Sequence, residues 1–159
     1  MKKKIGIIGL GNPLRGDDGV GLVLLRYLQD CKKTLSKEID FIDGGTSGMN
    51  LVHFLENYDS VFLLDAVDFK GTPGELRKFT VEEVKNQKIQ WFLSTHEPDF
   101  LSVFAILQQL GKIPTRVLIF GVQPKDMSYK VGFSKEINTA LPHLQKKILK
   151  EIQSMIISW

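Results

Sequence analysis

Short apolar segments alternate with longer amphipathic segments along most of the chain. Some short segments, such as residues 61–64 and 117–120, are continuously apolar, which is typical of parallel strands covered on both faces. The pattern predicts an α/β fold: a three-layer sandwich in which a twisted, mostly parallel five-stranded sheet has helices on both faces. The expected strands are residues 4–10, 39–43, 60–65, 74–79 and 116–122, and the expected helices are residues 19–32, 48–57, 81–86, 98–110 and 134–158.

Two of these elements depart from the general pattern. Residues 74–79 follow a Gly-Thr-Pro turn and alternate charged with apolar side chains, so we expect an antiparallel strand at the edge of the sheet. The last helix contains Pro142. Because proline has no backbone N–H and crowds the preceding turn, we expect a kink or a break there.

Composition restricts the possible partners. The 159 residues, 43% of them hydrophobic and 25% charged, suit a single domain spanning residues 1–159. The net charge is only +3, and the basic clusters are scattered, so we expect no nucleic-acid partner. No apolar segment has the length of a membrane span, and the first is too short for a signal peptide. Cys31 is the only cysteine, which excludes an intrachain disulfide. We expect a cytoplasmic monomer that does not bind membranes.

A glycine-rich turn, residues 9–19, joins the first expected strand to the first expected helix and carries two adjacent acids, Asp17 and Asp18. A turn at this place usually presents backbone N–H groups to an anion such as a phosphate. Two carboxylates would repel a phosphate and attract a metal ion. The turn therefore favours a cation site over a nucleotide site. The structural alternative is that either acid caps the first helix.

Two further acids and one histidine lie near the ends of other elements. Asp43 ends the second expected strand, Asp65 ends the third, and His96 lies in a polar loop just before Pro98. Because the carboxyl ends of parallel strands meet at one edge of a sheet, these side chains can converge with Asp18. Each has a structural alternative: Asp43 precedes two glycines and suits a simple turn, and a lone histidine is more often structural. Asp65 follows four apolar residues, where an unpaired carboxylate is costly.

One imidazole with two or three carboxylates forms an open coordination set for a divalent transition metal. Such a site can activate a water molecule and polarise a carbonyl group, which is the chemistry of metal-assisted hydrolysis. The other two histidines, His53 and His143, lie within expected helices, and we assign them to packing or solvent.

With these motifs in place, the chain resembles the maturation endopeptidases of nickel–iron hydrogenases. The resemblance runs through nearly the whole length, in order. It is carried by the block from Gly9 to Gly21, the Asp-Gly-Gly-Thr-Ser-Gly segment from Asp43 to Gly48, the pair Asp65-Ala66, the loop Ser94-Thr95-His96, residues 121–124 and the closing helix with Pro142.

The resemblance implies both a function and a set of site residues. Members of this family have a compact, phosphorylase/hydrolase-like α/β fold. They remove a C-terminal extension from the precursor of the hydrogenase large subunit after nickel has been inserted. The family's metal ligands correspond to Asp18, Asp65 and His96, and Asp43 corresponds to another acid that matters for activity. The resemblance thus implies Asp18, Asp43, Asp65 and His96 as catalytic residues, a large-subunit precursor as partner, and nickel supplied by that substrate, or another divalent metal, as cofactor.

Two alternatives remain at the level of sequence. A nickel- or hydrogenase-binding chaperone that does not cut would use the same residues. Peptidyl-tRNA hydrolase also opens with Gly-Leu-Gly-Asn-Pro, but it continues with Thr-Arg-His-Asn, where this chain has Arg-Gly-Asp-Asp at residues 15–18. It also needs a basic face for tRNA, which the slight net charge does not favour.

Overall fold

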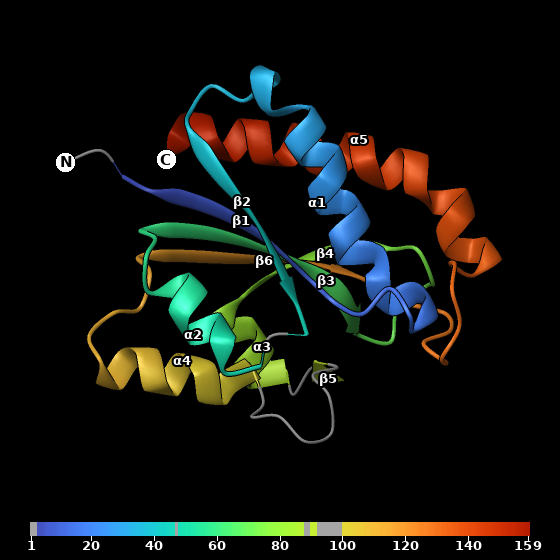
Figure 1. Ribbon diagram of the computed structural model, residues 1–159, viewed down its shortest axis with the longest axis horizontal. Helices are drawn as coiled ribbons and strands as arrows, with labels where there is room; N and C mark the ends of the chain where they lie inside the picture. Colours follow the sequence, from blue (N-terminus) through green and yellow to red (C-terminus); the bar gives the residue numbers. More distant parts are fainter. Residues whose placement is uncertain (1–2, 47, 88–89, 92–99) are drawn as a thin grey trace.

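The structure, a computed structural model, describes residues 3–46, 48–87, 90–91 and 100–159, with only the backbone at residues 90 and 91. These residues form three layers, a central sheet with a layer of helices on each face (Figure 1). The main sheet contains, in spatial order, β2 (Ile39–Gly45), β1 (Ile5–Leu10), β3 (Ser60–Asp68), β6 (Arg116–Val122) and β4 (Leu76–Thr80).

The strand directions confirm the predicted fold class. The pairs β1–β2, β1–β3 and β3–β6 are parallel, and β4 is antiparallel to β6 at the edge of the sheet, as its turn and charge pattern predicted. A short strand, β5 (Gln90–Trp91), pairs in the antiparallel direction with the far end of β3. The sequence pattern did not predict this strand.

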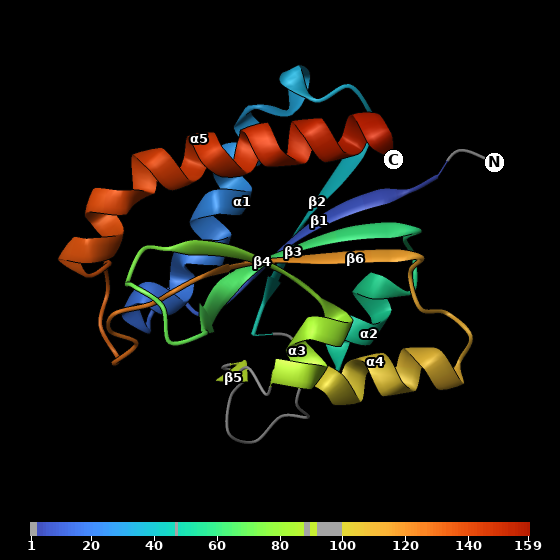
Figure 2. The same ribbon diagram turned by 180° about the vertical axis from the view of Figure 1, so that it is seen from behind.

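Helices cover both faces of the sheet, as Figures 1 and 2 show from opposite sides. α1 (Val20–Asp30) and α5 (Lys135–Ser158) pack on one face. α2 (Asn50–Leu55), α3 (Val81–Gln87) and α4 (Phe100–Gln109) pack on the other. Two 3-10 helices, η1 (Gly16–Gly19) and η2 (Lys32–Thr34), flank α1.

The period of two along the strands divides the core between these faces. Ile7 and Phe62 pack toward α1 and α5, whereas their neighbours Ile8 and Leu63 pack toward α2 and α4. All four side chains are fully buried. Burial of each stabilises the fold by about 2 kcal/mol relative to exposure. Side chains on both faces of these strands therefore contribute to stability, in agreement with their central position in the sheet.

Pro142 bends α5 without breaking it. The helix is continuous from residue 135 to residue 158, and its first turns stand at an angle to the rest in both views (Figures 1 and 2). Ser134 caps the helix by accepting the N–H of Ile137 at 3.3 Å. At the other end, the Trp159 ring stacks on Phe62 with centroids 4.4 Å apart. The helix continues through Pro142, and Ile137 and Leu144 on either side of the proline are buried in the core.

In the part of the chain that the structure describes, no helix combines the length and the apolar character that crossing a membrane requires.

Candidate active site

The turn that follows β1 brings two of the predicted site residues to one place. Gly11 has a φ of 129°, and a Cβ atom on it would lie 1.8 Å from the backbone oxygen of Asp18 and 3.6 Å from Oδ1 of Asp65. Only glycine fits this position, because an L side chain would clash with the backbone and rarely adopts such a φ. The Asp18 backbone and the Asp65 carboxylate therefore approach the same residue, Gly11.

Asp18 lies in η1 and is only 4% exposed. Its Oδ2 accepts the backbone N–H of Asn12 at 3.0 Å. Burial raises the pKa of Asp18, and the Asn12 hydrogen bond and the positive charge of Arg15 oppose this shift in part. Neither η1 nor α1 has a side-chain cap, so the capping alternative for Asp18 is wrong. Because its charge is costly in the folded protein, this carboxylate is suited to accept a proton or a cation.

Asp65 lies in β3 and is 3% exposed. Oδ1 accepts the N–H of Ala66 at 2.8 Å, and the residue pairs with Gly121 of β6. Asp65 is thus a buried acid near the carboxyl end of a central strand, as the sequence pattern predicted. Burial of a second acid beside the Gly11 turn provides additional oxygen ligands of the kind that divalent cations accept.

Asp17, next to Asp18 in sequence, has a different role. It is fully buried, and its Oδ1 accepts the N–H of Ser134 at 2.7 Å. Its Oδ2 accepts the N–H groups of Lys125 and Asp126 at 2.8 and 2.9 Å and the hydroxyl of Ser134 at 2.8 Å. The carboxylate therefore ties η1 to the loop between β6 and α5. It does not cap the first helix, and its oxygens are occupied by protein donors.

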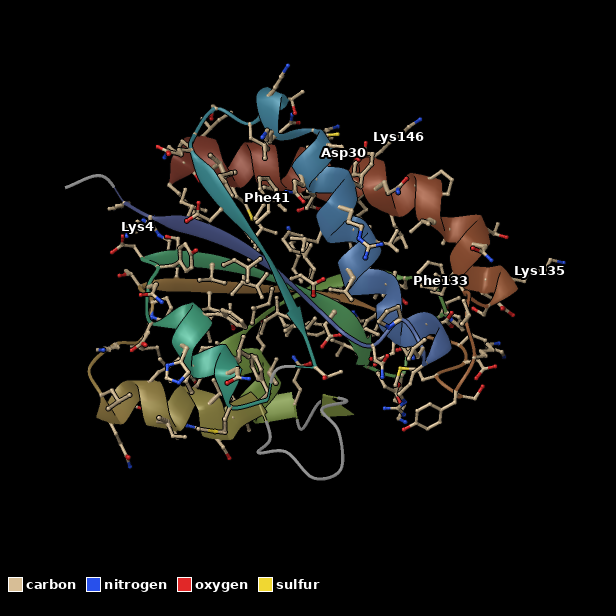
Figure 3. The ribbon with its side chains drawn as sticks, in the orientation of Figure 1. Lys4, Asp30, Phe41, Phe133, Lys135 and Lys146 are labelled. Atoms are coloured by element: carbon tan, nitrogen blue, oxygen red, sulfur yellow. The ribbon has the colours of Figure 1, made fainter. Side chains whose placement is uncertain are left out.

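This connection is visible in the arrangement of the chain. Both ribbon views show the loop between β6 and α5 beside η1 (Figures 1 and 2). Phe133 and Lys135, which flank Ser134 in sequence, lie at the same end of the molecule (Figure 3). The end of α5 at Trp159 lies at the opposite end (Figure 1).

Asp43 is exposed at the end of β2 and belongs to the turn that supports Gly11. Its Oδ1 accepts the N–H of Gly45 at 3.0 Å, and the Gly45 carbonyl accepts the N–H of Gly11 at 2.8 Å. Among the described residues, the hydrogen bond of Asp43 is to this turn and not to Asp18 or Asp65. The geometry thus gives Asp43 a positioning role, and its participation in catalysis stays a prediction.

His96, the remaining predicted ligand, lies outside the described residues, as do its neighbours from 92 to 99. Within the described part of the chain, no three histidine, cysteine, aspartate or glutamate side chains form a group that could hold a metal ion. The set of Asp18, Asp65 and His96 therefore stays a prediction. The side chain of His53 is 75% exposed beside Glu56, as expected for a histidine outside the site.

One residue near the site was missed by sequence reasoning. Gln123, which directly follows β6, is 6% exposed. Its Oε1 accepts the N–H groups of Phe69 and Gly71, both at 3.0 Å, and its Nε2 donates to Asp68 at 3.1 Å. It fixes the turn after β3 and thereby the strand that carries Asp65. The available signal was a polar residue between a buried strand and Pro124.

The arrangement of this fold is that of solved hydrogenase maturation endopeptidases. The structure is similar to HybD from Escherichia coli with a TM-score of 0.77 and 23% identity, over 96% of this chain and 93% of that one. It is also similar to a hydrogenase 2 maturation peptidase from a Thaumarchaeota archaeon, with a TM-score of 0.63 and 26% identity over 94% and 98% of the two chains.

Sequence comparison then identifies the family. The model of the HycI hydrogenase maturation proteases matches residues 25–151. A Methanocaldococcus jannaschii protein, provisionally named a hydrogenase maturation protease, is 35% identical over 96% of this chain and 99% of its own length. The chain belongs to the hydrogenase maturation protease family, as its motifs indicated. The hydrogenase expression/formation protein HupD of Rhodobacter capsulatus is 31% identical over 79% of this chain. The matched region covers only 59% of the length of that relative.

Proposed function

We propose that this protein is an endopeptidase that removes the C-terminal extension from the nickel-loaded precursor of a hydrogenase large subunit, acting as a cytoplasmic monomer. The observation that carries the proposal is that two buried acids meet the same turn: the Asp18 carboxylate accepts the N–H of Asn12, and the Asp65 carboxylate lies beside the neighbouring Gly11. Membership of the maturation protease family supports the same reaction. It gives no support to the peptidyl-tRNA hydrolase alternative.

The chemistry of the two acids fits a divalent cation. Burial raises the pKa of Asp18 and thus disfavours its ionised form. A cation bound nearby would favour the ionised form again. We propose that Asp18, Asp65 and His96 contact the nickel that the precursor carries. Carboxylates and imidazole hold such an ion less firmly than thiolates do. The site can therefore recognise nickel on the precursor without extracting it.

The same acids can supply the proton transfers of hydrolysis. In the proposed reaction, one carboxylate accepts a proton from a water molecule as the water oxygen bonds to the scissile carbonyl carbon. The carbon–nitrogen bond then breaks, and the proton passes to the leaving amine. A carboxylate with a raised pKa is a better general base near neutral pH than an exposed one. Asp43 supports this geometry through its hydrogen bond to the turn that holds Gly11.

The direct test mixes the pure protein with nickel-loaded and nickel-free large-subunit precursor and follows the mass of the precursor. Loss of a C-terminal peptide from the loaded form alone supports the endopeptidase. Stable binding without a change in mass would instead identify a chaperone that does not cut.

Variants then assign the residues. Asp18→Asn, Asp65→Asn and His96→Ala should each abolish cleavage, since each removes a proposed contact to nickel or water, while circular dichroism shows an unchanged fold. His53→Ala is the matched control and should cleave normally, because this side chain is exposed and contacts Glu56, which is not a proposed site residue. Full activity in any of the first three variants removes that residue from the site.

A further inference from the structure

Three large apolar side chains are exposed beside the candidate active site. Leu14 is 61% exposed, Tyr129 83% and Val131 85%. Among the described residues, the last two are the most exposed of the large apolar side chains. Single exposed apolar residues are common on protein surfaces, but a contiguous group of them marks an interaction surface. We call these three residues the apolar lip.

The backbone brings the members of the lip together from distant parts of the sequence. The N–H of Lys130 donates to the carbonyl of Leu14, and the N–H of Gly16 donates to the carbonyl of Lys130, both at 2.9 Å. This short parallel pairing sets Leu14 beside the two lip residues that flank Lys130. The guanidinium of Arg15 lies 5.4 Å from the centre of the Tyr129 ring, a distance at which a cation–π attraction acts.

The loop that carries Tyr129 and Val131 is held in place by hydrogen bonds. The buried carboxylate of Asp17 accepts four hydrogen bonds from the loop that carries Tyr129 and Val131. Lys130 also pairs with Asp126 at 2.8 Å. The apolar side chains thus project from a segment that is hydrogen-bonded on both sides, so a ligand that covers them meets a surface already arranged for binding.

The lip and the candidate catalytic acid are held by one turn. The N–H of Leu14 donates to Oδ1 of Asn12 at 2.9 Å, and the N–H of Asn12 donates to Oδ2 of Asp18 at 3.0 Å. An extended polypeptide advances about 3.3–3.6 Å per residue. A chain whose scissile bond lies at Asp18 and that continues toward Leu14 reaches the lip within a few residues, and this proximity is the reason to name the precursor as the partner that covers the exposed surface.

We propose that the apolar lip binds the segment of the precursor next to the scissile bond, through a bulky aliphatic or aromatic side chain of that segment. This inference rests on the proposed function. It adds a surface that selects the substrate independently of nickel. The role we assign to the lip is apolar contact with the substrate and not a part in the bond-breaking step.

The test compares the double variant Tyr129→Ser/Val131→Ser with Ile157→Ser, which alters a side chain that is 75% exposed near the far end of α5. With the nickel-loaded precursor, we expect the KM of the double variant to rise about tenfold, a loss typical of removing apolar contacts at an interface, with kcat unchanged. The control should match the wild type. The conservative double variant Tyr129→Phe/Val131→Ile should retain the wild-type KM.

Several outcomes would overturn the inference. An unchanged KM in the serine variant excludes the lip from substrate binding, and a fall in kcat alone would assign it a structural role. Self-association of the wild type that the serine variant abolishes without a change in KM would make the lip a contact between copies of this chain.

Failure of the proposed function can be recognised separately. If the wild type does not cleave the loaded precursor, the affinity of the precursor is measured by calorimetry. Binding about tenfold weaker in the serine variant then still supports the lip, and equal binding rejects it.

Discussion

Replacing Asp17 with asparagine changes the charge of a fully buried group without changing its size. The carboxylate accepts three backbone N–H groups and one hydroxyl. An asparagine amide has one accepting oxygen, so its NH2 group must face at least one backbone donor. If the oxygen keeps the three donors on Oδ2, the N–H of Ser134 loses its acceptor.

The cost follows from these contacts. A buried donor without a partner costs about 1–3 kcal/mol, and hydrogen bonds to a charged acceptor contribute more than neutral ones, about 1.5–3 kcal/mol each. We therefore expect Asp17→Asn to lower the free energy of unfolding by about 2–5 kcal/mol, which is a large part of the typical 5–15 kcal/mol. Urea denaturation at neutral pH measures this difference.

The adjacent acid provides the matched control. In Asp18→Asn the amide oxygen can still accept the single hydrogen bond from Asn12. The substitution also removes a carboxyl group whose pKa is raised by burial, that is, a group whose charge is costly in the folded protein. We expect stability within about 1 kcal/mol of the wild type, or higher, together with loss of cleavage. An Asp17→Asn variant as stable as the wild type, or equal destabilisation by the two substitutions, would refute the division of roles between these neighbours.

Two further substitutions test the turn and the loop near the site. Gly11→Ala should destabilise the protein by more than about 3 kcal/mol in thermal denaturation, because its Cβ would meet the Asp18 backbone at 1.8 Å. Gly111→Ala, at a φ of 65° with open space around it, should cost only about 1–2 kcal/mol; equal losses would contradict the steric argument. The hydrogen bond from Lys70 holds the pKa of Asp68 below its usual range. The contribution of the ionised Asp68 to the free energy of unfolding is therefore fully present above about pH 4 and is lost as the pH falls through the lowered pKa. Urea midpoints measured from about pH 5 to pH 2 should fall less steeply in Asp68→Asn, and parallel curves would show that Asp68 contributes nothing.

The two adjacent acids show where sequence reasoning reaches its limit. Their position after a buried strand was sufficient to predict that the turn carries carboxylates at the binding edge of the sheet. Helix capping was the local alternative, and the structure shows no such cap. The partners of Asp17 include Ser134, 117 residues away, and no local pattern indicates a contact at that separation. Gln123 was missed for the same reason, since it bonds to a turn more than fifty residues earlier.

The amino-acid sequence by itself determined the five strands of the main sheet, including the edge strand, and the two buried faces, because the period of apolar side chains is a local property that burial enforces wherever the chain folds. It also determined that Asp18 follows a buried strand and that Asp65 lies near the carboxyl end of another, although β3 continues beyond the predicted end at Asp65 to Asp68. The tertiary structure alone decided that Asp18 and Asp65 approach Gly11, that Asp17 holds a loop, and that α5 bends at Pro142 without breaking. Each of these outcomes depends on contacts between residues distant in sequence, whose free energy exists only once the layers have packed together.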